Sequence, residues 1–210
     1  LNAALCEFNN NYSAQDGGAI EISSNGINIV TLNECTFTNN AANLGGGIQQ
    51  WGGQLSIDDC EFNGNSAVHD GGAVRTQGAG TTTTINSSSF SGNLAGSHGG
   101  AMHIYQDSSP TITDCTITNN TASGGGGFSV WYNSNPILTN CTFENNSALL
   151  ADSTYGKGGG MYITGCSPTL TACQFSGNLT DDGSGGGVFI ISYPSYAEPT
   201  FVGCTFDDNF

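Results

Sequence analysis

The sequence predicts an all-β fold, a right-handed single-stranded parallel β-helix that forms a solenoid of about seven to eight coils. Three observations support this fold class. A motif recurs every 25 to 32 residues along the chain, apolar residues within it alternate at period two, and Gly, Asn, Thr and Ser are abundant between them. A repeat of this length is typical of solenoids and propellers, period-two alternation indicates strands, and these residue types are poor helix formers.

The first half of the repeat reads Cys-x-Phe-x-x-Asn. Two copies are degenerate, with Ser88 in place of Cys and Ile117 in place of Phe. We expect the Cys and Phe columns to point into the tube, where each side chain stacks on its counterpart in the next coil. The Asn column is expected at the following bend, because Asn tolerates left-handed backbone and its amide can hydrogen-bond along a stack of identical turns. The three columns are Cys6, Cys35, Cys60, Cys115, Cys141, Cys173 and Cys204; Phe8, Phe37, Phe62, Phe90, Phe143, Phe175 and Phe206; and Asn11, Asn40, Asn65, Asn93, Asn120, Asn146, Asn178 and Asn209.

The second half of the repeat is a Gly-Gly pair followed by Ala or Gly and an apolar residue, as in residues 71–74. We expect this pair to pass close to neighbouring coils or to adopt positive φ. A further apolar column, which includes Leu32 and Ile57, lies three residues before the Cys positions. Each coil is therefore expected to contain about three short strands, with longer loops at 149–157 and 180–184 that extend two of the coils.

The pairing of Phe-x-x-Asn at 8–11 with Gly-Gly-Ala-Ile at 17–20 resembles the repeat of the chlamydial polymorphic outer membrane proteins and of similar bacterial and algal surface proteins. The resemblance extends over nearly the whole chain. It implies a right-handed β-helix that forms the exposed part of an adhesin or autotransporter passenger, at the cell surface or outside the cell. Because the sequence starts and ends inside a repeat, we expect residues 1–210 to be a single β-helix domain within a longer chain.

The charge balance excludes some partners. The chain has 17 acidic residues against two cationic ones, Arg75 and Lys157, which gives a formal net charge of −15. Phosphate backbones repel such a chain, so nucleic acid is not an expected partner. No run approaches the roughly 18 to 20 apolar residues that span a bilayer, so direct membrane insertion is not expected.

The cysteine column has two interpretations. It is either a disulfide framework formed in an oxidising compartment or a ladder of buried free thiols that act as small apolar side chains. The Cβ vectors of stacked cysteines run parallel, which suits disulfide geometry poorly, and Ser88 interrupts the column. The ladder of free thiols is therefore favoured. Cys166 lies outside the column and is expected to be a lone thiol or part of an incomplete pair.

The strand after each Gly-Gly pair is expected to show its second and fourth residues to solvent. These positions carry both tryptophans of the chain, beside Tyr, His, Gln and Arg residues. Aromatic rings along a flat β face can stack on sugar rings or anchor a protein partner. The alternative is that they pack under a loop or another domain. The candidate binding residues are Gln49, Trp51, Arg75, Gln77, His103, Tyr105, Trp131 and Tyr162.

Polysaccharide lyases and hydrolases are the competing class, because other parallel β-helices carry such activities. Lyases need a cationic base, and hydrolases need carboxylates that converge on one groove. His69, Asp70 and His98 adjoin Gly-Gly pairs and form a minor candidate for acid–base or metal chemistry. No catalytic residue is predicted, because the other acidic candidates lie in different columns or loops: Asp58, Asp59, Asp114, Asp181 and Asp182.

No cofactor is expected. Asp-rich turns offer oxygen ligands for calcium, but the nine-residue Gly-Gly-x-Gly-x-Asp repeat of calcium-loaded β-rolls is missing. An outward Thr column that includes Thr31 and Thr84 is interrupted by Ser56 and Ile137, so a flat ice-binding array is not sustained.

The sequence therefore predicts a non-enzymatic, extracellular structural or adhesive module of a cell-surface or secreted protein. Its rod would present outward columns to a glycan, a protein receptor or a copy of itself. Two alternatives are a polysaccharide-active β-helix enzyme and a subunit of an extracellular filament, in which rods pair end to end through their open strand edges.

Overall fold

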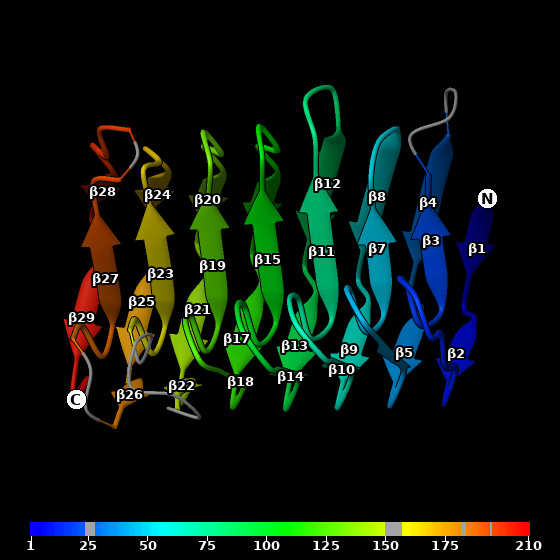
Figure 1. Ribbon diagram of the computed structural model, residues 1–210, viewed down its shortest axis with the longest axis horizontal. Helices are drawn as coiled ribbons and strands as arrows, with labels where there is room; N and C mark the ends of the chain where they lie inside the picture. Colours follow the sequence, from blue (N-terminus) through cyan, green and yellow to red (C-terminus); the bar gives the residue numbers. More distant parts are fainter. Residues whose placement is uncertain (24–27, 150–156, 182–183, 194) are drawn as a thin grey trace.

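The computed structural model describes residues 1–23, 28–149, 157–181, 184–193 and 195–210. They form a rod of short parallel strands, with the two ends of the chain at opposite ends of the rod (Figure 1). The described residues contain strands and turns but no helix, which confirms the all-β prediction. Most of the predicted loop at 149–157 and the centre of the loop at 180–184, including Asp182, lie outside the described residues.

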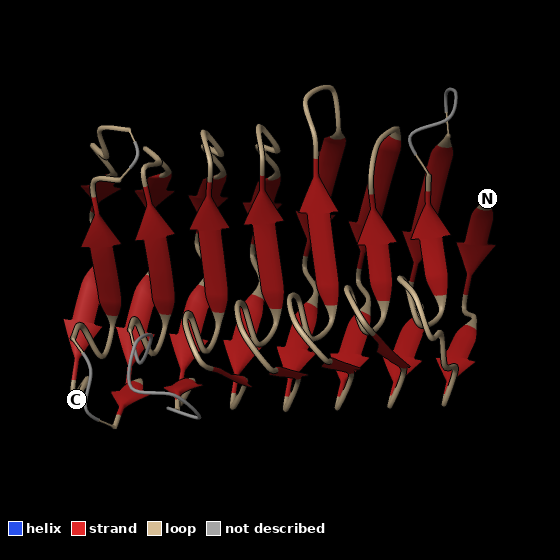
Figure 2. Cartoon of the chain, in the orientation of Figure 1, coloured by secondary structure: helices blue, strands red, loops and turns tan. Residues whose placement is uncertain are grey.

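The coils between the two ends pass through four sheets in a fixed order, and turns join the strands (Figure 2). Sheet 1 contains β1 (Asn2–Ala4), β4 (Ile29–Asn33), β8 (Gln54–Asp58), β12 (Thr82–Asn86), β16 (Thr111–Thr113), β20 (Ile137–Thr139), β24 (Thr169–Thr171) and β28 (Thr200–Val202). Sheet 2 contains β2 (Glu7–Asn9), β5 (Thr36–Thr38), β9 (Glu61–Asn63), β13 (Ser89–Ser91), β17 (Thr116–Thr118), β21 (Thr142–Glu144), β25 (Gln174–Ser176) and β29 (Thr205–Asp207).

The other two sheets complete the coil. Sheet 3 contains β6 (Ala41–Ala42), β10 (Ser66–Ala67), β14 (Leu94–Ala95), β18 (Thr121–Ala122), β22 (Ser147–Ala148) and β26 (Leu179–Thr180). Sheet 4 contains β3 (Ile20–Ile22), β7 (Ile48–Gln50), β11 (Val74–Gln77), β15 (Met102–Tyr105), β19 (Phe128–Trp131), β23 (Met161–Thr164) and β27 (Val188–Ile191). The sequence predicted about three strands per coil, and the structure adds a fourth, the two-residue strand of sheet 3. The sequence did not reveal this strand, because two residues are too few to show an apolar alternation.

Equivalent positions of successive coils pair in register, as Phe62 does with Phe90. The Phe column consequently forms a continuous stack inside the tube. The rings of Phe8, Phe37, Phe62 and Phe90 lie nearly parallel, with centroids 4.5 to 4.8 Å apart. Such spacing follows from the inter-strand distance of about 4.8 Å, and it places Phe37 and Phe62 each between two parallel rings.

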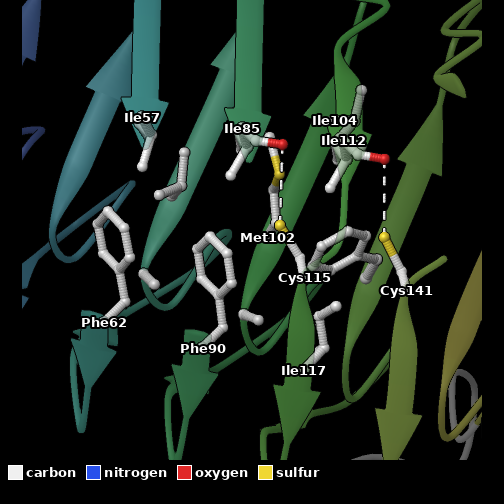
Figure 3. Close-up of a cluster of buried hydrophobic side chains, with 14 of the residues drawn as sticks. Ile57, Phe62, Ile85, Phe90, Met102, Ile104, Ile112, Cys115, Ile117 and Cys141 are labelled. Carbon is white, nitrogen blue, oxygen red and sulfur yellow. Dashed lines mark hydrogen bonds between the residues drawn. The ribbon is translucent and has the colours of Figure 1, made fainter. Parts of the chain in front are cut away.

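Ile117 interrupts this stack between Phe90 and Phe143, with which it pairs in sheet 2. Phe128 of sheet 4 fills the space left by the smaller side chain. Its ring stands nearly perpendicular to those of Phe90 and Phe143, at centroid distances of 6.3 and 5.0 Å. Figure 3 shows Phe62, Phe90 and Ile117 in line along the interior. The core therefore keeps its packing because an aromatic ring from the opposite wall replaces the missing one.

The Asn column forms a buried hydrogen-bonded ladder. Asn120 donates from Nδ2 to Asn146 Oδ1 at 2.9 Å and to the Phe90 carbonyl at 3.0 Å. Its Oδ1 accepts from the backbone N–H and Nδ2 of Asn93, both at 2.9 Å. The ladder was predicted, but the expected left-handed backbone is wrong for the Asn itself, since the positive φ belongs to the residue before it, such as Asn119.

The cysteines point into the core as predicted, and all eight are free thiols. Each column cysteine donates from Sγ to the carbonyl two residues earlier, as Cys115 does to Thr113 at 3.2 Å. Cys115 and Cys141 also reach carbonyls of the preceding coil (Figure 3). Ser88 continues the column rather than breaking it, because its Oγ donates to the Asn86 carbonyl at 2.7 Å. Burial raises the pKa of Cys60 and of Cys166 to about 11, so both thiols stay protonated near neutrality.

The two glycines of each Gly-Gly pair meet different constraints, as expected. Gly71 has a φ of 69°, a conformation that L side chains rarely adopt. Gly72 has ordinary backbone, but a Cβ atom there would lie 2.1 Å from the carbonyl oxygen of Gly100 in the next coil. The first glycine therefore allows the turn, and the second allows the coils to approach.

Substituting Asn120 tests the ladder. Asn120→Ala removes both donors and the shared acceptor, and it leaves buried groups of Asn93, Phe90 and Asn146 without these partners. We expect a loss of about 3 kcal/mol or more in the free energy of unfolding, measured by urea denaturation. Asn63→Ala is the control, because its half-buried amide contacts only Glu61, at 3.3 Å, and its expected cost is about 0.5 kcal/mol or less. Equal costs for the two variants would contradict the role of the ladder.

The compensation between Ile117 and Phe128 is tested by a double-mutant cycle. Ile117→Phe alone adds an eighth ring to the Phe column where Phe128 already lies, and overpacking of this kind costs about 1–3 kcal/mol. Phe128→Met alone leaves a void, although Met occupies the equivalent position in β15 and β23. The double variant is expected to be more stable than the sum of the two single effects predicts. Strict additivity in chemical denaturation would show that the two positions are independent.

Candidate functional site

The outer face of sheet 4 gathers all eight residues predicted to bind. Strands β7, β11, β15, β19 and β23 pair in register, so their outward side chains form two columns along the rod. The first column contains Gln49, Arg75, His103, Ser129 and Tyr162, and the second contains Trp51, Gln77, Tyr105, Trp131 and Thr164. We call these two columns together the sheet 4 strip.

The prediction that these side chains face solvent is wrong for the first column. Gln49 and His103 are at most 1% exposed, and Arg75 and Tyr162 are each 5% exposed. Trp51, Gln77, Tyr105 and Trp131 of the second column are half-buried. Alternation identifies which side of a sheet a residue faces, but other parts of the chain cover this side.

The cover includes the residues that directly precede the Gly-Gly pairs. Asp70, His98, Gly124, Lys157 and Ser184 form a column of backbone bridges beside the strip. The His98 ring lies 4.4 Å from that of Trp131 and 5.7 Å from that of His103. Sequence reasoning noted Asp70 and His98 only as a minor candidate for acid–base or metal chemistry. Their position before Gly-Gly is the signal that places them against the strip.

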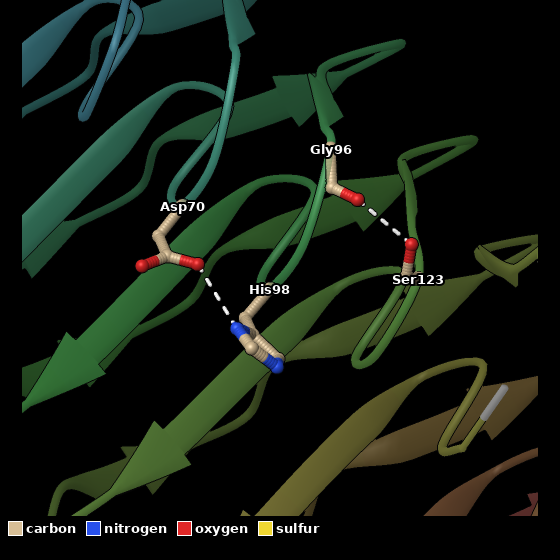
Figure 4. A network of polar contacts seen from close by, with 4 residues as sticks. All are labelled: Asp70, Gly96, His98 and Ser123. Carbon is tan, nitrogen blue, oxygen red and sulfur yellow. Dashed lines mark hydrogen bonds and ion pairs between the residues drawn. The ribbon is translucent and has the colours of Figure 1, made fainter. Parts of the chain in front are cut away.

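Asp70 and His98 form the one ion pair found among the described residues, with Nδ1 of His98 2.9 Å from Oδ1 of Asp70 (Figure 4). Burial alone would raise the pKa of Asp70, but the His98 hydrogen bond and the nearby His103, His98 and Arg75 lower it to about 2.

Ser123 also donates to the Gly96 carbonyl at 2.7 Å, which joins two neighbouring turns (Figure 4). The exposed His69 does not complete a metal site, since the described part of the chain contains no cluster of three or more ligand side chains.

Arg75 lies between two aromatic rings of neighbouring coils. Its guanidinium carbon is 5.5 Å from the centroid of Trp51 and 5.0 Å from that of Tyr105. Cation–π contacts at these distances stabilise a desolvated cation. Burial lowers the pKa of Arg75, but arginine remains protonated in proteins.

Within the described ranges, eight buried polar atoms of the strip have no hydrogen-bond partner. Buried polar groups are nearly always bonded, so such a concentration requires an explanation, for which a ligand or ordered water is the usual one. The atoms are Gln49 Oε1, Arg75 Nε, Arg75 Nη1, Gln77 Oε1, His103 Nδ1, Ser129 Oγ, Trp131 Nε1 and Thr164 Oγ1.

The other acidic candidates lie on different sheets or turns. Asp58 ends β8 of sheet 1, and Asp59 and Asp114 occupy left-handed turns between sheets 1 and 2. Asp114 accepts a hydrogen bond from Asn140. Asp181 follows the last strand of sheet 3. The structure therefore does not bring these carboxylates to the strip.

Comparison with protein families matches residues 46–210 to the right handed beta helix region. The chain therefore belongs to the right-handed β-helix family, which confirms the predicted handedness. Residues 5–23 match the Chlamydia polymorphic membrane protein repeat, in agreement with the resemblance seen in the motif. Comparisons with curated proteins and with solved structures gave no significant match. Within the described ranges, no helix has the length and apolar character needed to cross a membrane.

The buried histidine of the strip predicts a pH dependence. Burial first, and then the charges of His98 and Arg75, lower the pKa of His103 to about 3, and Asp70 opposes this only in part. The unfolded chain takes up a proton below about pH 6.5 while the folded state does not, so stability falls as the pH falls from 6.5 towards 3. From pH 7 to pH 5 we expect a loss of about 2 kcal/mol from this group. The contribution of Asp70 is lost only below about pH 4.

Urea denaturation at the two pH values measures this effect. His103→Gln should remove most of the loss between pH 7 and pH 5, because glutamine does not titrate. His69→Gln is the matched control and should keep the loss, since His69 is exposed. A wild-type stability that stays constant between pH 7 and pH 5 would contradict the assignment of a neutral, buried His103.

Proposed function

We propose that this chain is a non-enzymatic structural and adhesive module of a cell-surface or secreted protein, and that its sheet 4 strip binds a glycan. The β-helix and the Chlamydia polymorphic membrane protein repeat support a surface module. The observation that carries the binding role is the strip itself, where half-buried aromatic rings lie beside buried polar atoms that have no partner.

The geometry suits a sugar chain that runs along the rod. Trp51, Tyr105 and Trp131 come from three different coils, which are spaced by about 4.8 Å per coil. Aromatic rings offer apolar surface to sugar faces, while a neighbouring indole N–H or side-chain amide can bond to hydroxyl groups. Tyr105 and Trp131 lie within strands, and Trp51 directly follows β7 with its N–H bonded to the Ile22 carbonyl, so little backbone order has to be gained on binding.

A role without catalysis is supported by the dispersal of the carboxylates. Among the described residues, Asp70 and His98 are the one acid–base pair in direct contact, and His98 packs against Trp131. A protein receptor or a second copy of the chain is the alternative occupant of the strip.

Binding to immobilised glycans tests the proposal. Trp131→Ala and Tyr105→Ala are each expected to weaken binding about tenfold or more, as is usual for aromatic residues at the centre of a binding surface. Tyr12→Ala is the control, because Tyr12 is 78% exposed and lies outside sheet 4. Thermal melts followed by circular dichroism confirm that the variants are folded.

Three outcomes would contradict the proposal. The absence of binding to any glycan would reject the sugar ligand. An equal loss for Tyr12→Ala would place the site elsewhere. Turnover of a bound polysaccharide would show that the module is an enzyme.

A further inference from the structure

Both cationic side chains of this acidic protein lie along the sheet 4 strip. Lys and Arg number two against 17 acidic residues. Arg75 lies in β11, and Lys157 immediately precedes the Gly-Gly pair that leads into β23, with its Nζ 5.0 Å from the ring centroid of Phe189. The two positions are three coils apart, or about 14 Å along the rod. A chain with a net charge of −15 thus places its positive side chains on one face.

Among the described residues, no carboxylate forms a direct ion pair with the buried Arg75, although the charges of Asp70 and Asp16 act on it from a greater distance. Its side chain is 5% exposed, and its Nε and Nη1 have no hydrogen-bond partner within the part of the chain that the structure describes. The nearby carboxylate of Asp70 is bonded to His98 instead. A buried cation without hydrogen-bonded compensation is costly, and an incoming carboxylate would provide that compensation.

The side chains between the two cations are aromatic. Tyr105, Trp131 and Tyr162 lie on the three strands from β15 to β23, and Trp131 Nε1 is a further donor that has no partner among the described residues. A folded peptide or an acidic side chain can supply a carboxylate to Arg75 and nothing more. A chain of sugar rings also covers the aromatic surfaces between the cations and accepts a hydrogen bond from the indole.

We propose that the strip recognises an acidic saccharide, a chain of sugar rings that carry carboxylates, with one carboxylate on Arg75 and another near Lys157. This inference rests on the proposed function and adds the chemical class of the glycan. The planar guanidinium favours a carboxylate, and its flanking rings restrict its orientation. Lys157 adds a more exposed point charge, whose contribution is smaller and depends on salt.

Calorimetric titration with two matched probes tests the charge requirement. The probes are an oligogalacturonate and the same oligosaccharide with every carboxylate methyl-esterified, which keeps the rings and removes the negative charges. The wild-type protein is expected to bind the acid form at least about tenfold more tightly than the ester, since hydrogen bonds to charged groups contribute more than neutral ones. Equal affinities would overturn the inference while leaving the glycan-binding function intact.

Variants locate the effect. Arg75→Gln should remove most of the preference for the acid form, Arg75→Lys should keep part of it, and Lys157→Gln should reduce it more at low salt than at high salt. Ser91→Asp on sheet 2 changes the net charge by the same amount as Arg75→Gln and should leave binding unchanged. An Arg75→Gln protein that retains the full preference would overturn the assignment. If Arg75→Gln does not fold, Arg75→Lys and the two-probe comparison on the wild type still decide the question.

A further probe separates saccharide from peptide. Poly-glutamate that bound as tightly as oligogalacturonate would assign the strip to an acidic peptide and overturn the inference. If neither galacturonate probe binds but a neutral glycan does, the acidic class is wrong and the proposed function remains. If no glycan binds, both the proposed function and the inference of an acidic saccharide are wrong.

Discussion

The buried amide of each ladder asparagine bonds to its own copy in the next coil, and the rest of the rod depends on this constraint. The bond requires the same residue at the same height in every coil. Length can therefore vary only in connections away from the ladder, and each strand enters its sheet in register. Because the backbone repeats, the Phe rings stack and the thiols align without any further specification.

The same repetition organises the outer face of sheet 4, although no core packing requires the residues found there. Gln49, Arg75 and His103 occupy equivalent positions yet differ in chemistry. The interior columns vary little, whereas this column changes from coil to coil. A rod of uniform coils thus presents a line of different side chains at fixed spacing, and the unpaired polar atoms in that line mark the part of the molecule that folding alone does not explain.

The period of the sequence was sufficient to predict the coils, the inward columns and the glycine positions, because each of these repeats. Sequence alone was less informative where the burial or packing of a side chain depends on residues from another part of the coil. Alternation placed Arg75 and His103 on the outer side of a strand, but their burial comes from residues such as His98, which lies just before the turn at Gly99 and packs against the same face. Likewise, Ser88 and Ile117 read as defects in their columns until the carbonyl of Asn86 and the ring of Phe128 are seen beside them.

The ring of Phe128 has a consequence for assembly. Coils that resemble one another can in principle stack on the wrong neighbour, and a slip by one whole coil would preserve most ladder bonds. A ring that fits only beside Ile117 makes one alignment of sheets 2 and 4 better packed than its neighbours. The irregular coil thereby favours one register of an otherwise periodic chain. It also divides the phenylalanine stack into two segments of fixed length.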